Sequence, residues 1–452
     1  MTLFHRRILY IIFILLFLVI TPAILFYAAG YNFNFQSGAV ERTGILIIKT
    51  DPRGAQVHLG DKKKYNWLYT LVYGEKPLLT PLNLRNLLPD DYNITISKDG
   101  YFDYHKKITL YPGQTVVLDT VTLLKKSAPE PLASENVIKT ALAPDGSRLA
   151  AVTDASLIIV DLNSGQMDTL PLGITATPAD AFDIVWSPTD KKILLTLANW
   201  PVFNLETGTR QIALGDFFPV ADARAHWDSN NSNTLLLRRN GGIYSFDLAK
   251  KKSMLLFTAA GLQDFLFKDG NFYTVETRQT GSAVVVYDDN SFATLKTISL
   301  PGARSYEFKN TQANLLYVYE PSHALLYVID PFSFVPLQAS LSNVKDFSVS
   351  GNTLLYWNEF EIWSYDSANK INSLLTRISR PIGRILLDDS YIIYNTPAAI
   401  TSFERDVRDS LNATDILDWQ ETSDLTLNVA GTYLYFVSPQ SGWRALWRLA
   451  VK

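Results

Sequence analysis

One pattern in this sequence recurs about every 40 residues: an apolar strand that ends in an acidic or amide residue and runs into a polar turn. The residues that end this pattern are Asp161, Asn204, Asp247, Asp288, Asp330, Asp366 and Glu404, with successive spacings of 43, 43, 41, 42, 36 and 38 residues. Each unit contains four strand patterns. A period near 40 with four strands per unit is typical of the blades of a β-propeller.

The recurring acidic or amide residue has a local explanation. Its side-chain oxygen is able to accept a hydrogen bond from the backbone N–H two residues further on, which fixes the turn into the outer strand. A row of carboxylates is also a possible set of metal ligands, but these residues lie on separate units. We therefore interpret all seven as turn residues and predict no metal site.

Composition restricts the class of protein and its partners. Aromatic residues make up 12% of the chain, and this content favours strands over helices. The chain has no cysteine, which excludes disulfides, thiolate metal ligands and cysteine nucleophiles. Its formal net charge is −3, without long runs of one sign, so we expect no nucleic-acid partner.

The N-terminal segment predicts a membrane helix. Residues 8–29 are apolar, and about 22 helical residues span roughly 33 Å, enough to cross a bilayer core. Arg6 and Arg7 precede this segment, so the positive-inside rule predicts a cytoplasmic N terminus and an extracytoplasmic remainder in the cell membrane. A cleaved signal peptide is the alternative, but the apolar run is long for one and lacks a good cleavage site. We favour an uncleaved signal-anchor.

Residues 43–125 combine alternating strand patterns with turn sequences at 51–54, 89–91 and 112–113, which predicts a small antiparallel β domain. This stretch resembles the PEGA domain, a small β module of bacterial and archaeal envelope proteins. The matching positions are Pro52, Gly54, Ala55, Val57, Thr80, Pro81, Pro89, Tyr92, Gly100 and Tyr101. Arg53 replaces a residue that is usually acidic, and Asp91 replaces a glycine. The resemblance implies an envelope location and binding or structural work, with no catalytic residues to carry over.

An additional segment, residues 61–76, is rich in basic and aromatic residues: Lys62, Lys63, Lys64, Tyr65, Trp67, Tyr69 and Tyr73. Such residues favour anionic headgroups at a membrane surface, or a glycan. Alternating aromatics are also strand formers, so we favour a lengthened hairpin whose aromatics pack on the small β domain.

The first two repeat units closely resemble the TolB-type β-propeller repeat, through the sequence Pro144–Asp145–Gly146 and its counterpart Pro188–Thr189–Asp190 before apolar strands. This resemblance covers about residues 136–452 and implies binding surfaces without a particular ligand. We therefore predict an all-β protein with four parts: residues 1–30 as cytoplasmic tip and membrane helix, 31–125 as the PEGA-like domain, 126–135 as a linker, and 136–452 as a propeller. Eight blades are preferred over seven.

The last repeat unit has strand patterns near residues 425–429, 432–438 and 443–450, and no fourth. An open outer edge invites aggregation, so a strand from elsewhere is expected to complete this unit. The linker region 126–137 is the nearby unassigned piece, and its prolines are tolerable on an edge strand. We predict that it lies against the last unit.

No catalytic, cofactor-binding or metal-binding residue is predicted. The sequence has no G-x-S-x-G, H-E-x-x-H, P-loop or G-x-G-x-x-G motif. His226, Trp227 and Asp228 form a cluster that we interpret as structural. The acidic stretch 403–421 is interpreted as a solvated excursion from its blade and not as a calcium site, because Arg405 and Arg408 interrupt it.

These observations favour a binding or scaffold protein over an enzyme. We predict a membrane-anchored extracytoplasmic protein of the cell envelope, with the propeller as its interaction module. The expected partners are the membrane, through residues 8–29, and an envelope protein or cell-wall glycan, through the propeller. The alternative is an envelope enzyme, directed at glycans or peptides, that uses the propeller funnel.

Overall fold

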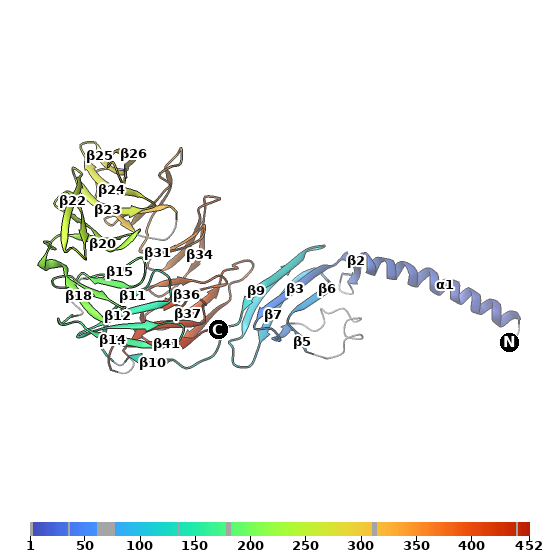
Figure 1. The fold of residues 1–452 in the computed structure, drawn as a ribbon. Helices are drawn as coiled ribbons and strands as arrows, with labels where there is room; N and C mark the ends of the chain where they lie inside the picture. Colours follow the sequence, from blue (N-terminus) through green and yellow to red (C-terminus); the bar gives the residue numbers. More distant parts are fainter. Residues whose placement is uncertain are drawn as a thin grey trace.

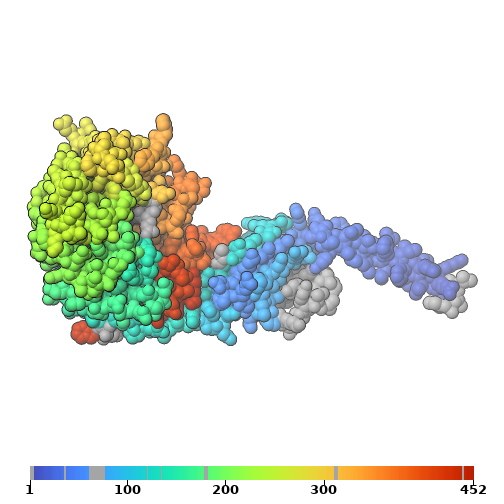
Figure 2. All heavy atoms as spheres, in the orientation of Figure 1, coloured from blue at the N-terminus to red at the C-terminus, as the bar shows by residue number. Residues whose placement is uncertain are grey.

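A computed structural model describes residues 3–34, 37–60, 77–133, 135–177, 182–309, 314–439 and 442–452. An N-terminal helix, a small β unit (residues 43–125) and a ring of β-sheets follow one another along the chain and in space (Figure 1). The space-filling view shows the ring as the widest part and the helix projecting alone from the small β unit (Figure 2). Segment 61–76 lies outside the described residues, so both interpretations of it stay open.

Helix α1 (Leu3–Ala28) matches the predicted membrane segment. Its 26 residues correspond to about 39 Å of helix, and its apolar stretch His5–Ala28 is not buried against the rest of the protein. Pro22 lies inside the helix without ending it, as membrane helices tolerate. The helix fits a signal-anchor by length and composition. Two short strands, β1 (Tyr31–Asn34) and β2 (Ala39–Arg42), form a hairpin directly after it.

The small β unit consists of two sheets that enclose one core. The first has the order β6 (Leu82–Leu87), β3 (Gly44–Asp51), β9 (Thr115–Thr122), and the second has the order β5 (Leu78–Leu79), β4 (Gln56–Leu59), β7 (Asp90–Ser97), β8 (Tyr104–Leu110). Alternate residues of β3 are buried, as a period of two requires, and Leu46 and Ile48 pack against Ile94 and Ile96 of the other sheet. One pair departs from the antiparallel expectation: β3 and β9 are parallel. Parallel strands need a crossover, which the second sheet supplies here.

The ring contains eight four-stranded antiparallel sheets within the described residues, and the first seven follow chain order from an inner to an outer strand. The first two sheets are β11 (Val137–Leu142), β12 (Arg148–Thr153), β13 (Ser156–Asp161), β14 (Met167–Pro171), and then β15 (Ile184–Trp186), β16 (Lys192–Leu195), β17 (Pro201–Asn204), β18 (Thr209–Ala213). The third and fourth are β19 (Arg224–Asp228), β20 (Asn231–Arg239), β21 (Gly242–Asp247), β22 (Lys252–Thr258), and then β23 (Leu262–Lys268), β24 (Asn271–Arg278), β25 (Gly281–Asp288), β26 (Thr294–Leu300). The fifth to seventh are β27 (Glu307–Lys309), β28 (Leu316–Glu320), β29 (Leu325–Ile329), β30 (Leu337–Leu341); β31 (Asp346–Ser350), β32 (Thr353–Trp357), β33 (Glu361–Asp366), β34 (Ile371–Arg377); and β35 (Ile385–Leu387), β36 (Tyr391–Asn395), β37 (Ile400–Glu404), β38 (Ala413–Leu417). The last sheet is β39 (Ser423–Leu427), β40 (Tyr433–Ser438), β41 (Ala445–Ala450) and β10 (Glu130–Ala133). A short 3-10 helix (Leu214–Asp216) follows β18.

Apolar side chains between neighbouring sheets hold the ring together. Each apolar cluster of the ring joins two successive sheets, and the last such cluster joins Tyr435 and Leu446 of the last sheet to Leu149 and Val160 of the first. The innermost strands β39 and β11 are also in contact. The sheets therefore close into a β-propeller, the fold that the repeat predicts.

Strand β10, from the predicted linker, completes the last sheet. It pairs antiparallel with β41, with Glu130 opposite Arg448 and Pro131 opposite Trp447. Because β10 is the outermost strand of this sheet, the missing N–H of Pro131 is tolerated. The prediction that this linker lies against the last unit is confirmed.

The recurring turn residues behave as predicted in six of the seven units. Asp288 is representative: its Oδ1 accepts hydrogen bonds from the backbone N–H of Asn290 (3.2 Å) and of Ser291 (2.8 Å). The other five that accept the N–H two residues on are Asp161, Asn204, Asp247, Asp330 and Asp366. The hydrogen bonds from Ser291 lower the pKa of Asp288. Glu404 is the exception, and its role is different.

The turn carboxylates predict a specific acid response. A carboxylate with a lowered folded-state pKa stabilises the fold above its unfolded pKa of about 3.9, and this contribution is lost as pH falls through the folded-state value. Asp288→Asn should therefore weaken the dependence of stability on pH between about pH 2 and 6, and Asn204→Asp should strengthen it. Urea unfolding of the full chain over this range checks both changes. Equal pH dependence in both variants and the parent would contradict the assignment.

Candidate functional site

The two ends of the propeller differ in what they contact. Tyr391 pairs with Glu404, so the turns at 388–390 and 405–412 lie at the same end of their sheet. The small β unit contacts this end, which we call the proximal end. The turns after the second strand of each sheet and the connections to the next sheet form the opposite, distal end.

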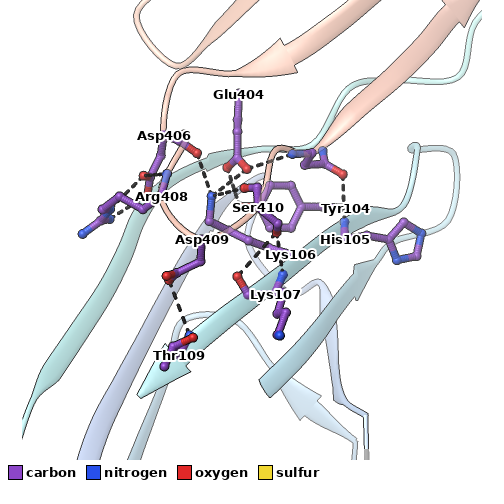
Figure 3. A network of polar contacts seen from close by, with 11 residues as sticks. Tyr104, His105, Lys106, Lys107, Thr109, Glu404, Asp406, Arg408, Asp409 and Ser410 are labelled. Atoms are coloured by element: carbon purple, nitrogen blue, oxygen red, sulfur yellow. Dashed lines mark hydrogen bonds and ion pairs between the residues drawn. The ribbon is translucent and has the colours of Figure 1, made fainter. Parts of the chain in front are cut away.

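Lys106 is the centre of the proximal contact (Figure 3). Its ammonium group lies 2.7 Å from Glu404 Oε1, and its side chain is only 1% exposed. The same Nζ also donates to the backbone oxygens of Asp406 (2.7 Å) and Ser410 (3.2 Å). An ammonium group has three donors, so this buried charge is fully satisfied.

Glu404 receives donors from both sides of the contact. Its Oε2 accepts a hydrogen bond from the Tyr104 hydroxyl (2.6 Å), and its Oε1 accepts one from the backbone N–H of Asn412 (3.0 Å) as well as the one from Lys106. Burial, followed by the neighbouring Glu404 carboxylate, raises the pKa of Tyr104 far above its usual value. Tyr104 therefore stays a hydrogen-bond donor to Glu404 at every physiological pH.

The loop 405–412 covers the free edge of strand β8. This strand is the outermost in its sheet, so alternate N–H groups point away from its neighbour β7. His105 N–H donates to Asn412 Oδ1 (3.0 Å), Lys107 N–H to Ser410 Oγ (2.8 Å) and Thr109 N–H to Asp409 Oδ2 (3.4 Å). Side chains of the propeller thus take the place of a fifth strand (Figure 3).

Asp406 and Arg408 hold this loop in shape. Two hydrogen bonds join them, from Arg408 Nε to Asp406 Oδ1 (2.7 Å) and from Nη2 to Oδ2 (2.6 Å). This guanidinium lowers the pKa of Asp406, so the pair stays ionised. A two-point pair of this kind fixes the loop conformation that presents its backbone oxygens to Lys106.

A second, apolar part of the contact lies beside the Lys106 network. Phe102 and Leu124 pack into the core between the last two sheets of the propeller. Two hydrogen bonds to backbone oxygens extend this contact: Lys125 N–H donates to Val451 O (3.0 Å), and the Ser127 hydroxyl donates to Ala450 O (2.7 Å). The small β unit is therefore joined to the propeller through a core and a buried ion pair, not through a flexible linker alone.

Two interpretations from the sequence are corrected here. Glu404 is not a turn residue, because its carboxylate binds Lys106 and Tyr104 and not the backbone two residues on. The first part of the acidic stretch 403–421 is not a solvated excursion, because it docks on β8. One signal pointed to this contact: in the alternating strand β8, Lys106 shares the buried face with Tyr104 and Ile108.

His226, Trp227 and Asp228 serve three separate purposes. The His226 ring packs edge-on against Phe265, with centroids 4.9 Å apart, and burial lowers its pKa. Trp227 Nε1 donates to Val185 O (2.9 Å) of the preceding sheet, and Asp228 accepts the Asn230 N–H (2.9 Å) in a turn. Each of the three side chains thus has a different structural partner. Within the described residues, no group of three His, Asp or Glu side chains is arranged to hold a metal ion.

The distal end carries an open groove of about 870 Å³ between the sheets that contain β28 and β32. Its lining includes Asn343, Lys345, Glu359 and Phe360. Phe360 is 42% exposed, and Lys345 Nζ donates to the backbone oxygen of Ile382 (2.5 Å). The groove offers an aromatic surface together with amide and carboxylate groups. It was not singled out from the sequence, because its residues come from separate turns.

Comparisons with known proteins agree with this architecture. Residues 43–125 match the PEGA domain family, which confirms that resemblance. Among solved structures, the Dos1 propeller is 11% identical and covers 72% of this chain and 95% of its own, with a TM-score of 0.51. A eukaryotic initiation factor is 14% identical and covers 73% of this chain and 91% of its own, with a TM-score of 0.50. BamB from Moraxella catarrhalis is 11% identical, and the match covers 72% of this chain and 99% of BamB, with a TM-score of 0.46.

No curated protein matches the chain. At the identities of the solved structures, the likeness concerns the fold. The chain combines a PEGA domain with a β-propeller.

The buried ion pair predicts how the two parts separate. Lys106→Met leaves the Glu404 carboxylate without its ammonium partner and should lower the free energy of opening this contact by about 3–5 kcal/mol. Hydrogen exchange at the β8 amides of His105, Lys107 and Thr109 measures this opening in the full chain. Lys107→Met is the matched control, because the side chains of Lys107 and of its partner Asp91 are both about half exposed. We expect little change in the exchange rates of this variant.

The interaction energy between the Lys106 and Glu404 side chains is obtained from a double variant. Lys106→Met combined with Glu404→Leu removes both charges and should recover part of the lost protection. Equal exchange rates in Lys106→Met and Lys107→Met would show that the ion pair does not hold the contact.

Proposed function

We propose that this chain is a membrane-anchored, extracytoplasmic binding or scaffold protein of the cell envelope. In this proposal, α1 is the anchor, the PEGA domain is a spacer, and the propeller is the interaction module. The proposed parts are residues 1–30, 31–125, 126–135 and 136–452. The observation that carries the proposal is the docked proximal end: because Lys106 and Glu404 fix this end to the spacer, the opposite, distal end is proposed as the end that meets a partner.

The proposed orientation rests on charge. Arg6 and Arg7 precede the apolar stretch, and a positive flank is retained on the cytoplasmic side. The PEGA domain and the propeller then lie outside the membrane. The absence of cysteine fits this location, because no thiol is exposed to an oxidising compartment.

The distal groove is the proposed binding surface. Its volume of about 870 Å³ lies within the usual range of ligand sites, and its turns vary without disturbing the sheets beneath them. Phe360 offers a ring for stacking, and Asn343 and Glu359 offer hydrogen-bonding groups, which suits a cell-wall glycan or a peptide segment of an envelope protein. The mixed charge of the groove gives no basis for nucleic acid.

Membrane topology is tested with single thiols, because the parent chain contains none. A membrane-impermeant maleimide should label Asn369→Cys, in the exposed turn after β33, on intact spheroplasts. It should label His5→Cys only after lysis. The opposite pattern would place the propeller in the cytoplasm and end the proposal.

Binding is tested by blocking one end of the same sheet at a time. Glu359 lies in the distal turn between β32 and β33, and Asn369 lies in the proximal turn between β33 and β34. The full chain in nanodiscs should retain peptidoglycan fragments or proteins from bacterial envelope extract. Coupling a bulky maleimide polymer to Glu359→Cys should abolish retention, and coupling it to Asn369→Cys should not.

Two results would contradict this proposal. Loss of retention only with the Asn369→Cys conjugate would place the binding surface at the proximal end. Cleavage of glycans or peptides by the full chain in an activity screen, without retention of either, would favour the enzyme alternative.

A further inference from the structure

The hairpin between α1 and the PEGA domain has two unlike faces. In its register, Phe33 lies opposite Val40, and Tyr31 lies opposite Arg42. Opposite residues of a strand pair share a face, so these four residues form one face, which we call the apolar hairpin face. The other face carries Asn32, Asn34 and Glu41.

The apolar hairpin face is more exposed to solvent than the polar face. Tyr31 is 38%, Phe33 44% and Val40 54% exposed. On the polar face, Asn34 Nδ2 donates to Glu41 Oε2 (3.1 Å), and the Ser37 hydroxyl donates to Glu41 Oε1 (2.7 Å). A two-stranded hairpin is marginally stable in water and needs something to cover its apolar side.

The apolar hairpin face continues the surface of the membrane helix. Phe26, near the end of α1, packs edge-on against Tyr31, with ring centroids 6.0 Å apart. The connection is short, because β1 begins three residues after Ala28. Thr43 holds it in place: its backbone N–H and its hydroxyl both donate to Gly30 O at 2.8 Å.

We infer that the apolar hairpin face lies in the interfacial layer of the bilayer that α1 spans. This inference rests on the proposed function, in which α1 is the membrane anchor. Tyrosine rings favour the headgroup level, and the Arg42 guanidinium on the same face suits lipid phosphates. Interfacial contact would cover the exposed side of the hairpin with the same lipid that surrounds Phe26.

The adjoining turn of the PEGA domain supports this arrangement. Gly113 has a positive φ of 72° and lies against Arg42, whose Nε would be 2.8 Å from an added Cβ. The Gly113 N–H donates to Thr43 O (3.2 Å). Tyr111, two residues earlier, is 62% exposed at this same end. A second exposed tyrosine beside the hairpin is expected of an end that faces a membrane.

The experiment measures the depth of spin labels on the full chain in vesicles of phosphatidylethanolamine and phosphatidylglycerol. Single labels are placed at Val40→Cys, at Asn32→Cys on the opposite face, at Leu16→Cys inside α1, and at Leu142→Cys on the propeller. Power saturation compares their accessibility to oxygen, which concentrates in lipid, with accessibility to a water-soluble nickel complex. We expect a severalfold higher oxygen-to-nickel ratio at Val40 than at Asn32 or Leu142, and the highest ratio at Leu16.

The outcomes separate this inference from the anchor itself. A lipid-like ratio at Leu16 with a water-like ratio at Val40 would overturn the inference and leave the anchor intact. Water-like ratios at both positions would overturn the anchor as well. Protection of Val40 from both reagents would show that protein, such as a second copy of the chain, covers the hairpin, and this result too would overturn the inference.

Discussion

Each propeller sheet has two apolar faces, and neither is stable in water until a neighbouring sheet covers it. The seven contacts between successive sheets leave one face of the first sheet and one face of the last sheet uncovered. The contact of Tyr435 and Leu446 in the last sheet with Leu149 in the first covers both of these faces. Strand β10 then occupies the outer edge of the last sheet. Ring closure is therefore the constraint on which the last sheet depends, and this sheet also forms, with the sheet before it, the core that receives Phe102 and Leu124.

Local patterns predicted the parts of this protein, and long-range contacts were harder to predict. The repeat period, the turn residues such as Asp288 and the PEGA positions are local, so the sequence alone indicated the propeller and the small β domain. The pairing of β10 was also predicted, because an unfinished last unit calls for a strand. The docking contact was not, since Glu404 occupies a turn position in the repeat and its partner Lys106 is 298 residues away.

Glu404 shows how one repeat can be adapted for a different purpose. Six units use an acidic or amide residue to fix their own turn, and the seventh has a longer side chain that reaches the neighbouring domain. Because Glu404 does not fix the turn that follows it, the Asp406–Arg408 pair and the contacts of Ser410 hold this turn instead. A repeated scaffold thereby gains one specific attachment point at its proximal end.

The pairing of β10 also determines the order in which the molecule can be completed during synthesis. Glu130 and Arg448 are 318 residues apart, and at about 5–20 residues per second the partner strand follows roughly 15–60 seconds later. The PEGA core needs only residues before 125, so it is able to fold while the propeller is still being made. During this interval β8 has a free edge and β10 has no sheet to join. These two segments are therefore the exposed strand edges of the unfinished chain, where wrong pairing is most easily made.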